Sequence, residues 1–107
     1  MIIAGGSPEN FVDKKLFGWI SKQAQHGKNL GGVSGGPLVL VKAGVMANKR
    51  MTIHWEHAES VSALTESVLL ERSLYVIDRE RMTCAGGTAP MDMVLALIKM
   101  NVYKIYI

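Results

Sequence analysis

The stretch Leu30–Trp55, LGGVSGGPLVLVKAGVMANKRMTIHW, decides the fold expected for this chain. Glycines at positions 31, 32, 35 and 36 surround Ser34, and an apolar helix pattern and a second alternating segment with His54 follow. This layout predicts a strand, a sharp turn that presents a side chain, a buried helix and another strand. Such turns lie at the mouth of an α/β sheet, where open parallel sheets form ligand crevices.

Size and composition indicate one small globular domain. The 107 residues are 49% hydrophobic and 20% charged, which is ordinary for such domains. The longest apolar runs, residues 37–41 and 93–98, fall far short of the ~20 residues of a membrane span. The start of the chain has no signal-peptide pattern, and the single cysteine, Cys84, cannot form an internal disulfide. We therefore expect a cytoplasmic protein with no membrane partner.

The net charge of +3 does not indicate a nucleic-acid surface. The basic residues occur in short clusters, such as Lys14-Lys15, Lys49-Arg50 and the pair Arg79 and Arg81, separated by acidic or apolar residues. DNA-binding faces carry a denser basic stripe. We interpret these clusters as solvated surface charge.

Strand and helix patterns alternate along the chain, which favours helices on both faces of a sheet. Strands are expected at residues 1–4, 29–33, 50–55, 68–70, 74–78 and 81–85. Helices are expected between an N-cap at Asn10 and a stop at Gly27, at residues 35–43 and 56–64, and after a cap at Thr88. The apolar faces expected to pack in the core are Val12, Leu16, Trp19 and Ile20, and Met91, Val94, Leu95 and Ile98. Met51, Ile53 and Trp55 are expected to share one face of their strand. Residues 101–107 fit either an added strand or a disordered end.

Several segments in fixed order resemble the amidotransferase-like (PfpI-type) sensor domain of AraC-family transcriptional regulators. They are LGGVSGGPLVL at Leu30–Leu40, AGVM at Ala43–Met46, RMTIHWEHA at Arg50–Ala58 and LYVIDRERMTCAGGTAPMDMVLALI at Leu74–Ile98. The resemblance extends from Ile2 to about Met100. It implies an α/β fold of the class I glutamine amidotransferase-like type, with three α/β/α layers and a flavodoxin-like, mostly parallel sheet.

The resemblance also implies that the fold is incomplete. Sensor domains of this family begin with a β-α-β-α stretch that is missing here, and a helix-turn-helix region that reads DNA follows them. We therefore expect residues 1–107 to form a single partial domain, cut at both ends, without a helix-turn-helix region. An incomplete sheet exposes an apolar edge and face, so we expect a homo-oligomer.

Ser34 stands where enzymatic relatives carry a cysteine nucleophile, and Gly35 stands where the hydrolases among them carry a histidine. A hydroxyl without a base is a poor nucleophile. The resemblance therefore implies a non-catalytic domain that senses a small-molecule metabolite. The ligand would contact Gly5, Gly6, Ser34, Gly35 and His54 at the carboxyl edge of the sheet. DNA would be a partner only through the absent helix-turn-helix region, and no cofactor is expected.

The residues also leave two other functions open. Ser34 could act with His54 in a PfpI-like hydrolase or amidotransferase-type enzyme. The chain could also be an assembly element without a binding site. His54 itself fits a structural hydrogen-bonding role as well as ligand contact.

The remaining candidate positions favour structural roles. His54 and His57 flank Glu56, but their spacing crosses the expected strand end, and a zinc site needs at least three protein ligands. We therefore expect no metal. Cys84 is expected to be a small buried hydrophobe. The segment Gly86-Gly87-Thr88 fits close packing of a helix on a strand, or an anion held at the helix N-terminus.

Overall fold

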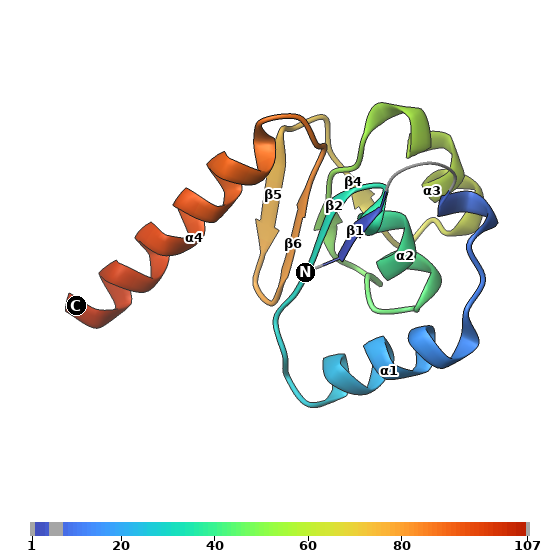
Figure 1. Cartoon of the computed structure of the whole chain (residues 1–107), viewed down its shortest axis with the longest axis horizontal. Helices are drawn as coiled ribbons and strands as arrows, with labels where there is room; N and C mark the ends of the chain where they lie inside the picture. Colours follow the sequence, from blue (N-terminus) through green and yellow to red (C-terminus); the bar gives the residue numbers. More distant parts are fainter. Residues whose placement is uncertain (1, 5–7, 107) are drawn as a thin grey trace.

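The computed structural model of the chain describes the backbone of residues 2–4 and 8–106 and the side chains of residues 8–100 (Figure 1). A four-stranded sheet has the order β1 (Ile2–Ala4), β2 (Leu30–Ser34), β6 (Arg81–Cys84) and β5 (Tyr75–Asp78). Strand β2 pairs in parallel with both of its neighbours, and β5 pairs antiparallel with β6. A second sheet pairs β3 (Arg50–Met51) with β4 (Leu69–Leu70) in parallel.

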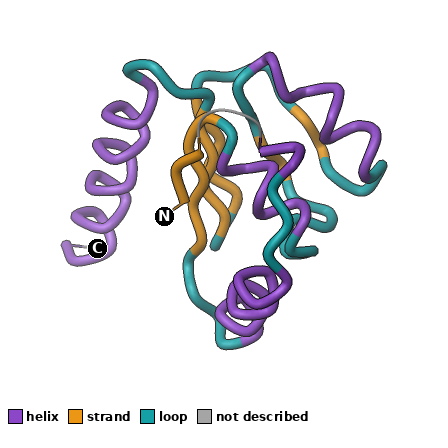
Figure 2. Tube along the Cα trace, turned by 45° about the vertical axis from the view of Figure 1, so that its right-hand side comes forward, coloured by secondary structure: helices purple, strands orange, loops and turns teal. Residues whose placement is uncertain are grey.

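Helices cover both faces of the four-stranded sheet. The α-helices are α1 (Lys14–Gln25), α2 (Gly36–Lys42), α3 (Ala58–Leu64) and α4 (Ala89–Tyr106), and two 3-10 helices are η1 (Pro8–Asn10) and η2 (Trp55–His57). Figure 2 shows α4, which ends at the C-terminus, on one side of the strands and the other helices on the opposite side. The expected three-layer α/β/α arrangement is confirmed. No helix among the described residues is long and apolar enough to cross a membrane.

The unit β2–turn–α2 forms as the sequence predicts, because Gly32 lets the helix approach the strand. A Cβ atom at Gly32 would lie 2.6 Å from the backbone nitrogen of Pro37, in the first turn of α2. This distance is shorter than side-chain carbons tolerate. The helix is buried from Gly36 to Leu40, as its apolar sequence predicts.

Two apolar clusters lie on the two sides of the sheet. The larger cluster packs around α2 and includes Ile20, Leu38, Leu40, Met46, Met51 and Val61. The smaller cluster joins the sheet to α4 and consists of Val33, Cys84, Ala89 and Met93. Cys84 is fully buried, which confirms its expected place in the core.

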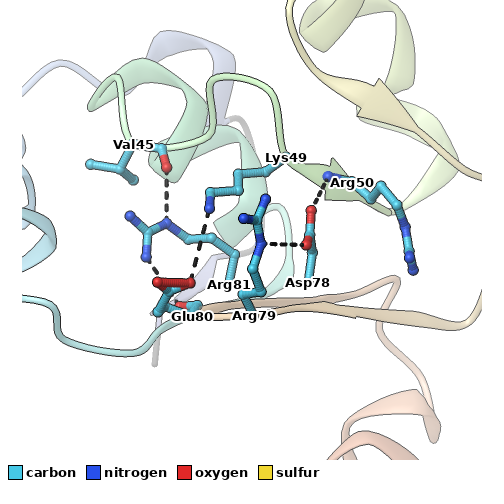
Figure 3. Close-up of polar contacts among 7 residues, drawn as sticks. All are labelled: Val45, Lys49, Arg50, Asp78, Arg79, Glu80 and Arg81. Atoms are coloured by element: carbon cyan, nitrogen blue, oxygen red, sulfur yellow. Dashed lines mark hydrogen bonds and ion pairs between the residues drawn. The ribbon is translucent and has the colours of Figure 1, made fainter.

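Polar contacts attach the β5–β6 hairpin to β3 and to the segment that precedes it (Figure 3). The Arg81 Nε donates to the carbonyl of Val45 at 2.8 Å, and the Asp78 carboxylate accepts from the backbone N–H of Arg50 at 2.8 Å. Arg81 is only 8% exposed. The expectation that its charge is solvated on the surface was wrong, because its side chain satisfies a buried carbonyl.

Helix α1 begins three residues later than expected. Asp13, rather than Asn10, is its N-cap, and the Asp13 carboxylate accepts from the N–H of Leu16 at 3.1 Å. Asn10 lies in the 3-10 turn η1 instead. Ile20 is buried as expected, but Trp19 is 57% exposed, so the expected apolar face is only partly correct.

The expected strand over residues 50–55 is reduced to β3. The backbone N–H of Thr52 donates to the Thr83 hydroxyl at 3.0 Å, and its own hydroxyl donates to the carbonyl of Ser73. The N–H of His54 donates to the carbonyl of Ser34 at 3.3 Å. These bonds replace a strand ladder. Trp55 then opens the turn η2 and is 79% exposed, so it does not share a strand face with the buried Met51 and Ile53 as expected.

The face of α4 that packs on the sheet differs from the expected one. Ala89 and Met93 are buried and Leu97 packs beside them. The residues expected on the buried face, Met91, Val94, Leu95 and Ile98, are 40–70% exposed. The helix also continues to Tyr106, so neither an added strand nor a disordered end forms over residues 101–106. Residues 101–106 contain no glycine or proline to stop the helix, and each added residue gains a backbone hydrogen bond.

Candidate functional site

Ser34 occupies a sharp turn between the end of β2 and the start of α2. Its backbone φ is +61°, a left-handed conformation that is uncommon for a residue with a side chain. Conformations of this kind cost free energy and cluster at functional sites. Ser34 is partly exposed, and Gly35, which follows it, is buried. The expected turn that presents a side chain is confirmed.

Three segments meet at this turn. The carbonyl of Ser34 accepts the backbone N–H of His54, which places the segment before η2 beside it. From the other direction, a Cβ atom at Gly86 would lie 3.5 Å from the Cβ of Ser34. Gly86 has φ of +105°, which glycine adopts readily and other residues do not. The loop between β6 and α4 therefore packs directly against Ser34.

Cys84 lies beneath the turn, on the strand next to β2. Burial raises the pKa of the Cys84 thiol, and backbone hydrogen bonds from Gly86 and Ser34 oppose that rise. Reactive cysteines have a lowered pKa and some exposure. Cys84 therefore has the character of a packing residue rather than of a nucleophile.

The structure brings three of the five expected ligand-contacting residues together. Ser34 and Gly35 form the turn, and His54 joins them through its backbone. Gly5 and Gly6 lie outside the described residues. The structure therefore shows the central part of the expected site, around Ser34, Gly35 and His54.

The imidazole of His54 is oriented by its own turn. Its Nδ1 accepts the backbone N–H of Glu56 at 3.3 Å, which caps η2. Its ring stacks on the indole of Trp55, with centroids 5.8 Å apart and planes 27° apart. A serine nucleophile needs a base that a third group aims at the hydroxyl. Within the described part of the chain, no carboxylate is hydrogen-bonded to His54 in that way.

A carboxylate is instead bound to the neighbouring histidine. The Oε1 of Glu9 lies 2.5 Å from the Nδ1 of His57, which is buried. The Ser60 hydroxyl donates to the same oxygen at 3.3 Å. The hydrogen bond from His57 is the largest cause that holds the pKa of Glu9 below its ordinary value. Glu9 and His57 therefore form a coupled pair next to His54, whose ring centroid is 6.0 Å from that of His57.

Sequence reasoning missed Glu9 because it lies 48 positions from His57. Its position in the short turn η1 gives no local signal of a distant partner. The Lys42 ammonium group fixes this turn by donating to the carbonyls of Pro8 and Phe11, at 2.9 and 3.1 Å. The contact therefore depends on tertiary packing of η1 against α2 and α3.

The sheet, the helices on both of its faces and the strained turn after β2 define a domain of the class I glutamine amidotransferase-like type. The chain belongs to the DJ-1/PfpI family, whose profile matches residues 1–100.

Its relatives include transcriptional regulators. The chain is 36% identical over 97 residues to the HTH-type transcriptional regulator CdhR of Pseudomonas aeruginosa. It is 35% identical over 98 residues to the HTH-type transcriptional regulator GlxA of Rhizobium meliloti. Each match covers 91% of this chain, but only 29% and 30% of the two regulators. The chain thus spans less than a third of the length of these relatives.

Solved structures agree with this assignment. An AraC family transcriptional regulator from Pseudomonas putida matches 84% of this chain and 49% of its own, with a TM-score of 0.78 and 25% identity. A ThiJ/PfpI domain protein from Brachyspira murdochii matches with a TM-score of 0.76 at 16% identity, which shows the fold alone. The resemblance inferred from the sequence is therefore confirmed, as a DJ-1/PfpI domain similar to part of AraC-type regulators.

Proposed function

We propose that this chain is part of the ligand-sensing domain of a cytoplasmic AraC-type transcriptional regulator and that it does not catalyse a reaction. Similarity to transcriptional regulators over nine-tenths of the chain is the observation that carries this function. A helix-turn-helix region outside residues 1–107 would then bind DNA. Ligand bound at the sensing site would change the DNA affinity of that region.

The turn at Ser34 is the proposed place for the ligand. Open parallel sheets form their ligand crevices at the carboxyl ends of the strands, and Ser34 is the last residue of β2. The Ser34 hydroxyl can donate and accept, and the His54 imidazole beside it can do either. These groups suit a small polar metabolite, such as an amino-acid-like compound. Gly5 and Gly6 belong to the same proposed site.

The absence of a catalytic role rests on how the histidines are engaged. The Nδ1 of His54 accepts from Glu56, and the Nδ1 of His57 contacts Glu9. The Glu9 carboxylate thus orients the imidazole of His57 and not that of His54. An unassisted serine hydroxyl is a weak nucleophile, so the strained turn supports binding rather than covalent chemistry.

The test is a thermal-shift screen of this chain against a panel of small polar and amino-acid-like metabolites, followed by calorimetry on each stabilising compound. A ligand at 100 times its Kd stabilises the folded state by about 2.7 kcal/mol, which such a screen detects. The variant Ser34→Trp should abolish binding, because the indole would fill the turn. The control Ser62→Trp, at an exposed position of α3, should bind as the wild type does. Equal binding by the Ser34→Trp protein would place the ligand elsewhere.

A homo-oligomer is part of the proposal. Apolar side chains exposed on α4, with Met91 70% and Leu95 55% exposed, support association, because large apolar patches on monomers are uncommon. Light scattering on the purified chain measures its mass in solution, and a monomer at micromolar concentration would contradict the expected oligomer.

A further inference from the structure

We propose that His54, Glu56 and His57 form a binding site for a divalent transition-metal ion of the zinc type. Each residue offers one ligand atom, and these atoms all lie within 4.8 Å of one another. Two imidazole nitrogens and one carboxylate oxygen are a known donor set for Zn²⁺, with a fourth position left open. The metal site shares His54 with the proposed ligand site, and metal binding alone tests it.

The turn η2 brings the three donors together. A strand through residue 55 would have set His54 and His57 apart, which is why the sequence spacing indicates no metal. In the structure the N–H of His57 donates to the carbonyl of His54 at 2.9 Å and closes a 3-10 turn. His54 is the N-cap of η2 and His57 is its last residue. The two imidazoles lie close together across this turn, with ring centroids 6.0 Å apart.

The distances suit ligation after small side-chain rotations. Ligand atoms bound at about 2.0–2.1 Å around a tetrahedral zinc ion lie roughly 3.3 Å from one another. The largest separation here, 4.8 Å, must therefore close by about 1.5 Å. Glu56 is exposed, so its side chain can rotate freely, and His54 is partly exposed and would give up some of its stacking on Trp55.

Glu9 provides the second, independent feature of a metal site. A histidine that binds a metal through one ring nitrogen usually donates its other N–H to a carboxylate, which fixes the ring and its tautomer. The Nδ1 of His57 contacts the Glu9 carboxylate in this manner, so a metal bound to His57 would take its Nε2. The Ser60 hydroxyl in turn holds the Glu9 oxygen. His57 is thus the preorganised ligand, and the two more exposed donors complete the site around it.

The experiment is titration of the metal-free chain with Zn²⁺ by calorimetry, together with the visible absorption of the Co²⁺-loaded protein. We expect one equivalent to bind and a tetrahedral Co²⁺ spectrum. Glu56→Gln, which removes an exposed ligand, should weaken binding by more than about 100-fold, beyond what a second-shell loss causes. Glu9→Gln should weaken it by about 10–100-fold, because it removes only the group that orients His57.

The chain offers matched controls for each ligand. His26 is an exposed histidine at the end of α1, and Glu59 is exposed in the first turn of α3. His26→Gln and Glu59→Gln should bind Zn²⁺ as the wild type does, whereas His54→Gln should lose binding. Because Glu56 is exposed, its variant keeps the test valid even if a His57 variant fails to fold. Absence of saturable binding at one equivalent, or unchanged affinity in Glu56→Gln, would overturn the site, as would an equal loss in His26→Gln.

Discussion

The backbone N–H of His54 donates to the carbonyl of Ser34 at 3.3 Å. This bond joins the segment before η2 to the strained turn after β2, although no strand ladder connects the two. The position of His54 is therefore set by the backbone. Its imidazole caps η2 and lies beside that of His57.

Close approach of α2 to β2 should make Gly32 intolerant of any side chain. A methyl group there would lie 2.6 Å from the Pro37 nitrogen, and overpacking of this kind costs about 1–3 kcal/mol. Gly32→Ala should lower the free energy of unfolding by at least that amount in urea denaturation. Gly18→Ala is the matched control, because Gly18 lies within α1 with no atom near its Cβ position. Alanine there should raise the unfolding free energy by up to about 1 kcal/mol. Equal effects of the two substitutions would contradict the described β2–α2 packing.

Asp78 should make the stability of the chain depend on acidic pH. The N–H of Arg50 is the largest cause that holds the pKa of Asp78 below its ordinary value, and Arg79 adds to it. A carboxylate with a lowered native pKa stabilises the fold above its unfolded pKa of about 3.9. That contribution is lost as the pH falls through the lower native pKa.

The variant Asp78→Asn isolates this effect. It should reduce the free energy of unfolding by about 1 kcal/mol at pH 7, because a neutral acceptor replaces a charged one. The difference from wild type should persist to about pH 5 and shrink below about pH 4. Urea denaturation at pH 7, 5 and 3 measures it, with the exposed Glu66→Gln as control. A difference that does not change with pH would show that the Asp78 carboxylate has no lowered pKa.

Cys84 should be unreactive in the folded chain. Its side chain is fully buried and burial raises the pKa of its thiol, so the thiolate that attacks disulfide reagents is scarce. Reaction with Ellman's reagent should be more than about 100-fold slower in buffer than in denaturant, because it must await local opening. Comparable rates in the two conditions would place the thiol at the surface.

Sequence patterns predicted the local units of this fold and the strained turn. The unit β2–turn–α2 follows from glycine positions and an apolar helix pattern that lie within one short stretch. The turn at Ser34 was predicted for the same reason. The strands β5 and β6 were likewise predicted, at residues 74–78 and 81–85.

Other features could not be predicted because they depend on contacts between distant residues. The Glu9–His57 pair joins positions 48 apart. The Thr83 hydroxyl accepts the hydrogen bond from the Thr52 N–H that a strand ladder would otherwise use. The face of α4 was misassigned for another reason. Apolar residues occur on every side of that helix, so periodicity could not choose between Met91 and Met93, of which only Met93 is buried.

In the proposed function, the Ser34 turn binds a molecule and does not form a covalent bond with it. The direct measurement is intact-protein mass spectrometry after incubation of the folded chain with a fluorophosphonate, with an active serine hydrolase in the same tube as a positive control. The hydrolase should be labelled and this chain should gain no mass, because no described carboxylate orients His54 toward the hydroxyl. Stoichiometric labelling that disappears in Ser34→Ala would contradict it and identify Ser34 as a nucleophile.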